Sequence, residues 1–220
     1  MRSRLDEQLS MLDAELLEMG ALIEHAITNA CEALEGADVG AANKAIDIDM
    51  KVDQKEREIE SLCLKMLLRQ QPVASDLRFI SAAMKVVTDV ERIGDHAADI
   101  AEIVPHLAGV RKAGDPAVSR SIEMGRKAHK MLQDAMSAFE AEDEAAAKAV
   151  IEADDAVDYD FNSIKRMLAA EIAADPGKVD AALDVLMVIK YLERIGDHAV
   201  NIAEWVEFLR TGRYHHEKMF

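Results

Sequence analysis

The sequence predicts an all-α protein in which two antiparallel three-helix bundles follow one another in tandem. The first observation is an internal repeat, because ERIGDHAADIAE at 91–102 returns as ERIGDHAVNIAE at 193–204, with ten of twelve positions identical. The second is composition: only 4% of the 220 residues are aromatic, with ten Gly and four Pro, which suits long helices. The third is that apolar residues recur every third or fourth position, as on the buried face of a helix.

Three helices are predicted in the first half of the chain, each with apolar residues at helical spacing. Gly36 and Gly40 mark the end of the first helix, and Pro72 stops the second. Ser75 or Asp76 is expected to cap the third helix, because both side chains can accept hydrogen bonds from free N–H groups of the first turn. The predicted ranges are about 5–34, 41–69 and 75–105.

Three further helices are predicted in the second half, after a linker at 106–114. Asp115 as N-cap and Pro116 at the first helical position form a strong helix start. The Asp-Pro-Gly stretch at 175–177 separates the last two helices, and the tail at 214–220 is expected to be loose. The predicted ranges are about 116–141, 144–174 and 179–209.

The repeat unit is three helices of roughly 30 residues, each about 45 Å long. Because the connections between them are short, neighbouring helices should be antiparallel. We therefore expect a first bundle at 1–108, a second bundle at 109–213 and a flexible tail at 214–220. The alternative is one continuous six-helix bundle.

The net charge of −16 makes nucleic acid a poor partner, since phosphate binding needs clustered Lys and Arg. Bound cations or basic protein surfaces fit such a chain better. No apolar run reaches the roughly 18 residues of a membrane span, and no signal peptide is visible, so a soluble cytoplasmic protein is expected. Cys31 and Cys63 lie too far apart on successive helices to pair within that hairpin, so both should be reduced.

Carboxylates recur four residues apart on the second and third helix of each repeat. In the first repeat, Asp49 precedes Asp53 and Glu91 precedes Asp95, while Asp99 continues the second stripe. Residues four apart share one face of a helix. If the two stripes face each other, at least four carboxylates lie together. The corresponding residues of the second repeat are Asp154, Asp158, Glu193, Asp197 and Asn201.

An acidic stripe opposite an apolar stripe is also typical of a solvent-exposed helix face. Like charges four residues apart, however, destabilise a helix by roughly 0.2–0.5 kcal/mol per pair, and here four such pairs recur at matching positions. Facing carboxylates either take up protons or bind cations. Because ligands made only of oxygen favour Mg, Mn, Ca or iron over zinc, we predict metal sites, with the solvated face as the alternative.

Other polar candidates are weaker. His96 and His198 are expected to lie half-buried at a helix contact, with a ligand role as the alternative. Arg92 and Arg194 should pair with the Asp three residues later in each motif. The sequence contains no Gly-rich phosphate loop, no G-x-S-x-G and no Cys/His pair at useful spacing, so catalytic residues are not predicted.

Two aromatic residues near the end of the last helix, Trp205 and Phe208, fall off its apolar stripe. They are therefore candidates for a contact with a partner protein. The alternative is that they pack between the two bundles.

The chain resembles the PhoU family, the accessory and regulatory proteins of bacterial phosphate uptake. The resemblance rests on ERIGDH at 91–96 and its repeat at 193–198, and it extends to PVASDLR at 72–78 and LEMG at 17–20. It covers nearly the whole chain. It implies two three-helix bundles related by a pseudo-twofold axis, with multinuclear metal clusters on the bundle surface and a tendency to form homodimers.

The resemblance also implies which residues bind metal and what the protein does. It implies that divalent or trivalent ions such as iron, manganese or magnesium bind to two ligand sets. The expected function is negative regulation of the phosphate regulon, linking the ATPase subunit of the phosphate-specific ABC transporter to a membrane sensor kinase. Membrane contact would occur only through these partners, at the inner membrane. The alternatives are a carboxylate-metal hydrolase and a metal-storage protein. The implied ligands are Asp49, Asp53, Glu91, Asp95 and Asp99, then Asp154, Asp158, Glu193 and Asp197, with Asn201 breaking strict symmetry.

Overall fold

The structure, a computed structural model, describes residues 2–111, 114–214 and 217–218. Within these residues the chain forms six long α-helices, one 3₁₀ turn and two very short strands. The helices begin and end within a few residues of their predicted bounds. They are α1 (Arg2–Gly36), α2 (Val39–Gln70), α3 (Ser75–Leu107), α4 (Pro116–Ala141), α5 (Glu144–Ala174) and α6 (Val179–Thr211).

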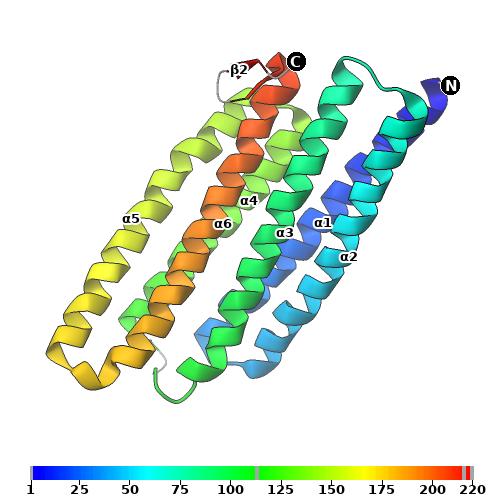
Figure 1. Cartoon of the computed structure of the whole chain (residues 1–220). Helices are drawn as coiled ribbons and strands as arrows, with labels where there is room; N and C mark the ends of the chain where they lie inside the picture. The colour runs from blue at the N-terminus through cyan, green and yellow to red at the C-terminus, as the bar shows by residue number, and fades with distance from the viewer. Residues whose placement is uncertain (1, 112–113, 215–216, 219–220) are drawn as a thin grey trace.

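The helices form two antiparallel three-helix bundles, as predicted. Helices α1, α2 and α3 pack on one another, and so do α4, α5 and α6. Between the halves, α3 lies beside α6 and α1 contacts α4, while α2 and α5 lie on opposite outer sides (Figure 1). The buried residues of both halves form one continuous, mainly aliphatic core.

Among the described residues, no helix has both the length and the apolar character needed to cross a membrane.

The contact between α3 and α6 uses equivalent positions of the two repeats, but the residues at these positions differ. The Nδ1 atom of His198 lies 2.8 Å from the Oδ1 atom of Asp89. At the matching positions, offset by 102, Tyr191 stacks on His96 with ring centroids 5.5 Å apart. The predicted place of both histidines, at a helix contact, is confirmed; His96 is half-buried and His198 is buried.

Aspartate side chains start three of the helices. Asp115 accepts hydrogen bonds from the N–H groups of Ala117 and Val118, which confirms the predicted start of α4. The predicted cap of α3 was wrong, because Ala74 occupies the N-cap position and makes no side-chain bond. A backbone turn instead provides an acceptor for a free N–H group of the first helical turn: the N–H of Asp76 donates to the carbonyl of Val73 at 3.2 Å. Similar aspartate caps stand at Asp38 and Asp143.

The end of α6 is ordered differently from the prediction. Phe208 is fully buried and Trp205 is 6% exposed, which contradicts the candidate partner contact and favours the alternative that both residues pack inside the protein. Tyr214 stacks on Trp205 with ring centroids 4.1 Å apart, which fixes a residue that was expected to be loose. The strands β1 (Arg213–Tyr214) and β2 (Glu217–Lys218) pair antiparallel. The rest of the predicted loose tail, residues 215–216 and 219–220, lies outside the described residues.

Both cysteines are free thiols, as predicted. Cys63 is buried, and Cys31 is half-buried against α4, where a side chain at Gly125 would begin 2.8 Å from its sulfur atom. Burial raises the pKa of the Cys31 thiol to about 11 and that of the Cys63 thiol to about 12. Neither thiol is therefore set up as a nucleophile.

Candidate metal centre

The acidic stripes of the first repeat face each other across α2 and α3. Asp49 and Asp53 project from α2, and Glu91, Asp95 and Asp99 project from α3. We call these five residues the first cluster. Carboxylate oxygens of Asp49, Asp53 and Asp95 all lie within 4.8 Å of one another. The structure thus brings together residues that are more than 40 positions apart in sequence.

A glycine in the repeated motif lets the two helices approach closely at the first cluster. A side chain at Gly94 would begin 3.1 Å from the Oδ1 atom of Asp49 and 3.0 Å from a methyl group of Ile23. The same relation returns in the second repeat, where a side chain at Gly196 would begin 3.1 Å from the Oδ1 atom of Asp154. The glycine of each motif thus permits a close approach between helices at its cluster.

Two carboxylate oxygens of the first cluster are buried without a hydrogen-bond donor. They are Oδ1 of Asp49 and Oε2 of Glu91. Arg92, as predicted, donates to Asp95 at 2.8 Å, but its Nε atom stays 3.4 Å from Glu91 without forming a hydrogen bond. Leaving such an acceptor buried and unpaired costs about 1–3 kcal/mol. These atoms are therefore suited to a ligand that the protein itself does not supply.

The negative charges of the first cluster repel one another. Burial, followed by the charges of Asp95 and Asp53, raises the pKa of Asp49 to about 6. Burial and the charge of Asp95 raise the pKa of Glu91 to about 7, although Arg92 counteracts this shift. A cation held between these oxygens would relieve both the burial and the repulsion. The residues present therefore fit a hard metal ion bound by oxygen.

Asp99 lies at the edge of the first cluster. Its charge is one of the causes that raise the pKa of Asp49, so it belongs to the same electrostatic environment. Its Oδ2 atom also lies 3.6 Å from the Nδ1 atom of His96, and its side chain is 41% exposed. Asp99 thus stands between the carboxylates and the contact of α3 with α6.

The second cluster comprises Asp154 and Asp158 of α5 and Glu193, Asp197 and Asn201 of α6. Here too Oδ1 of Asp154 is buried without a donor. Burial, then the charges of Asp158 and Asp197, raises the pKa of Asp154 to about 6. Two basic side chains bond this cluster: Lys190 is hydrogen-bonded to Glu193, and Arg194 bonds Asp197 at 3.1 Å, the latter as predicted.

The second cluster is less compact than the first. In the described parts of the chain, it contains no three carboxylates with oxygens within 4.8 Å of one another. The amide nitrogen of Asn201 donates to Asp89 of α3 at 3.0 Å, so this side chain joins the contact between the bundles. Sequence spacing placed Asn201 on the right helix face but did not reveal that bond.

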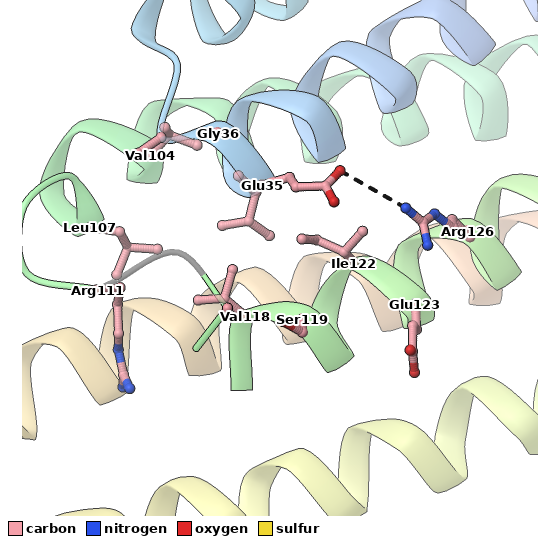
Figure 2. A pocket seen from close by; sticks show the side chains of 13 residues that line it. Glu35, Gly36, Val104, Leu107, Arg111, Val118, Ser119, Ile122, Glu123 and Arg126 are labelled. Atoms are coloured by element: carbon pink, nitrogen blue, oxygen red, sulfur yellow. Dashed lines mark ion pairs between the residues drawn. The ribbon is translucent and has the colours of Figure 1, made fainter. Parts of the chain in front are cut away.

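A cavity of about 340 Å³ lies elsewhere, where the ends of α1 and α3 meet the start of α4. Its lining mixes aliphatic residues such as Leu107 and Ile122 with the ion pair of Glu35 and Arg126, whose atoms are 3.9 Å apart. Figure 2 shows this pair across the cavity, and it shows the guanidinium group of Arg111 pointing away. No residue of either cluster lines this cavity, so the carboxylate clusters are the better candidate site.

The sequence model of the PhoU domain matches residues 16–104 and, separately, residues 122–206. The chain belongs to the PhoU domain family. Each matched segment contains one complete cluster, since the first cluster spans 49–99 and the second spans 154–201. The family assignment predicted from the repeated motif is thereby confirmed.

Curated relatives match nearly the whole chain. A phosphate-specific transport system accessory protein PhoU homolog from Pseudomonas aeruginosa is 38% identical over 207 residues, covering 93% of this chain and 84% of the relative. A protein of the same description from Clostridium acetobutylicum is 37% identical over 213 residues, covering 96% of both chains. The chain therefore spans most of the length of these relatives.

Solved structures confirm the fold. The crystal structure of PhoU from Pseudomonas aeruginosa superposes with a TM-score of 0.90 at 36% identity, covering 94% of this chain and 99% of that one. The phosphate transport system regulatory protein PhoU from Streptococcus pneumoniae gives a TM-score of 0.87 at 28% identity, covering 96% and 98%. The two bundles are thus the PhoU fold.

Proposed function

We propose that this chain is a regulatory adaptor of phosphate uptake that binds metal ions at its carboxylate clusters. The observation that carries the proposal is the presence of two PhoU domains, each with a buried carboxylate oxygen that lacks a donor. The described relatives are an accessory and a regulatory protein of phosphate transport, which supports a role beside a transporter. The proposed action is binding, not turnover.

The metal ions would supply positive charge at a strongly acidic surface. Asp49, Asp53 and Asp95 would hold an ion in the first cluster, with Glu91 close by. The protein's part is to present these oxygens on two rigid helices and to leave Oδ1 of Asp49 and Oε2 of Glu91 without a hydrogen-bond donor. Magnesium, manganese and iron all suit ligands made only of oxygen. Because the chain carries a net charge of −16, loading would reverse the charge locally and create a contact for a partner.

The expected partners are the ATPase subunit of a phosphate-specific ABC transporter and a phosphate sensor kinase, in the cytoplasm at the inner membrane. An acidic surface repels anionic lipid, so the proposal places membrane contact in these partner proteins. It includes negative regulation of the phosphate regulon and a homodimer, both from the family resemblance. A metal-dependent hydrolase would instead release phosphate from phosphate esters or polyphosphate, which a turnover assay detects.

Deletion of the gene is expected to switch on phosphate-starvation genes in phosphate-rich medium. A negative regulator that is absent can no longer transmit the phosphate-replete state of the transporter to the kinase. Transcript levels of the starvation genes, measured with and without a plasmid copy of the gene, check this result. The plasmid copy should restore repression.

A capture experiment from cells separates the adaptor from a metal store. The tagged full-length protein should recover transporter and kinase, and a chelator should reduce that recovery. Unchanged starvation-gene expression in the deletion strain, together with no recovered transporter or kinase, would contradict the regulatory proposal. The metal-store alternative would then account for the clusters.

A further inference from the structure

The two clusters occupy equivalent positions but carry different charges. Lys190 stands where the first repeat has Thr88, at an offset of 102, and Phe161 stands where it has Glu56, at an offset of 105. The second repeat thus gains a cation and loses an anion beside its cluster. The third difference is Asn201 in place of Asp99.

Lys190 reaches the buried ligand of the second cluster. Its ammonium group is hydrogen-bonded to Oε2 of Glu193, three residues further along α6. The same group lies 5.5 Å from the centre of the Phe161 ring, a distance at which the ring attracts a cation. The Glu193 side chain is only 15% exposed, whereas that of Lys190 is 45% exposed. The lysine therefore enters from the solvent side and ends on a largely buried carboxylate.

The first cluster has no equivalent of this contact. The hydroxyl group of Thr88 donates to the carbonyl of Met84 and so is turned away from Glu91. The Oε2 atom of Glu91 is buried without a donor, whereas the same atom of Glu193 is bonded to Lys190. Each motif arginine bonds the following aspartate of its own cluster, and Arg92 also lies 3.4 Å from Oε2 of Glu91 without forming a hydrogen bond.

Two differences act in the opposite direction. Arg57, 4.0 Å from Asp53, has Asn162 as its counterpart at an offset of 105, but the Arg57 side chain is 61% exposed, so solvent screens its charge. Asp155 stands where the first repeat has Met50 and adds one negative charge near Asp154. Its side chain is exposed, so solvent weakens its influence on a bound ion. Lys190, in contrast, bonds directly to one of the cluster's own oxygens.

We propose that Lys190 is a tethered counterion of the second cluster, which makes this cluster the weaker of two unequal metal sites. The inference rests on the proposed function, since it assumes that the clusters bind metal. A metal ion that uses Glu193 must displace the hydrogen-bonded ammonium group of Lys190, whereas no donor is hydrogen-bonded to Oε2 of Glu91. The first cluster therefore fills at low metal concentration and the second only at higher concentration.

The test uses Mn²⁺ as probe and the full-length chain, stripped of metal with a chelator. To measure the second cluster alone, metal binding at the first cluster is removed by substitution. All Lys190 variants are made in that same variant protein. In that background Lys190→Thr, which copies the first repeat, should tighten Mn²⁺ binding at least about tenfold. Free Mn²⁺ is measured by electron paramagnetic resonance during titration. The silencing changes are Asp49→Asn, Asp53→Asn, Glu91→Gln and Asp95→Asn.

Matched variants control for charge and for folding. Lys190→Arg keeps the positive charge and should leave the affinity near that of the parent. Lys190→Gln removes the charge with little change in size, and it replaces Lys190→Thr if circular dichroism shows that the threonine variant is misfolded. The reciprocal change, Thr88→Lys, should weaken the first cluster at least about tenfold in a background where the second is silenced. The silencing changes there are Asp154→Asn, Asp158→Asn, Glu193→Gln and Asp197→Asn.

The outcomes separate this inference from the proposed function. If the intact first cluster binds Mn²⁺ but neither Lys190→Thr nor Lys190→Gln tightens the second, the counterion role of Lys190 is wrong and the metal proposal stands. Equal affinity of the two intact clusters overturns the inference in the same way. If the intact first cluster binds no Mn²⁺, the metal part of the proposed function fails and the inference fails with it.

Discussion

Converting four carboxylates of the first cluster to amides should abolish metal binding in the first repeat and leave the helices intact. The four side chains supply the oxygens around the two buried acceptors that lack donors. They project away from the core, so helicity measured by circular dichroism should not change. The amount of Mn²⁺ bound per chain, measured after dialysis against Mn²⁺ and desalting, should fall by the amount that the first cluster binds in the parent. The changes are Asp49→Asn, Asp53→Asn, Glu91→Gln and Asp95→Asn.

The same variant should be more stable than the parent when both are free of metal. Burial and mutual repulsion raise the pKa of Asp49 and of Glu91, so at pH 8 their ionised forms destabilise the fold. Allowing for solvent screening, we expect a gain of about 1–2 kcal/mol in the free energy of unfolding. Added metal should stabilise the parent more than the variant.

A variant with four exposed carboxylates changed to amides controls for the loss of net charge. It should bind as much metal as the parent and gain little stability. If the cluster variant holds as much metal per chain as this control, the ligand assignment is wrong. If it is more stable and metal binding is the same, the first cluster is only a solvated acidic face. The control changes are Asp6→Asn, Glu7→Gln, Glu32→Gln and Asp47→Asn.

The second large effect concerns Arg111, in the segment between the two bundles. We expect Arg111→Ala to lower the free energy of unfolding by about 3–5 kcal/mol. The Arg111 side chain is only 7% exposed and donates to Asp115, the N-cap of α4, and to Glu171 of α5, both at 2.9 Å. Its removal leaves two largely buried carboxylates without this cation. Urea denaturation followed by circular dichroism measures the change.

The effect of Arg111→Ala should depend on pH. Burial alone would raise the pKa of Asp115, but hydrogen bonds from Arg111 and from the N–H of Val118 outweigh it and lower that pKa below its usual 3.8. A carboxyl group with a lowered pKa stabilises the fold above its unfolded pKa and loses this contribution as the pH falls. The difference between parent and variant should therefore shrink below about pH 4. A difference below about 1 kcal/mol at pH 7 would contradict the structural role of Arg111.

The helices could be predicted from the sequence because local signals mark their bounds. Asp115 followed by Pro116 starts α4 where the pattern predicted it. The start of α3 could not be predicted in the same way. Ser75 and Asp76 have suitable side chains, but a backbone turn that includes Ala74 at positive φ satisfies the helix end. Propensity shows which residue can act as a cap, whereas the preceding chain determines whether it does.

The acidic clusters could also be predicted, because spacing along antiparallel helices fixes which faces meet. The contacts that distinguish the clusters depend on side-chain directions that spacing does not contain. The offset of the repeat aligns Lys190 with Thr88, yet only the structure shows that Lys190 reaches Glu193. Likewise, Asn201 lies on the expected face, but its amide bonds Asp89 across the bundle contact.

Anomalous diffraction from Mn²⁺-loaded crystals of the full-length protein tests the central claim most directly. The account predicts a manganese peak between α2 and α3, bounded by oxygens of Asp49, Asp53 and Asp95. At limiting Mn²⁺ this peak should exceed any peak at the second cluster. A map from saturated crystals with no peak at the first cluster, or with peaks only elsewhere on the molecule, would contradict the account.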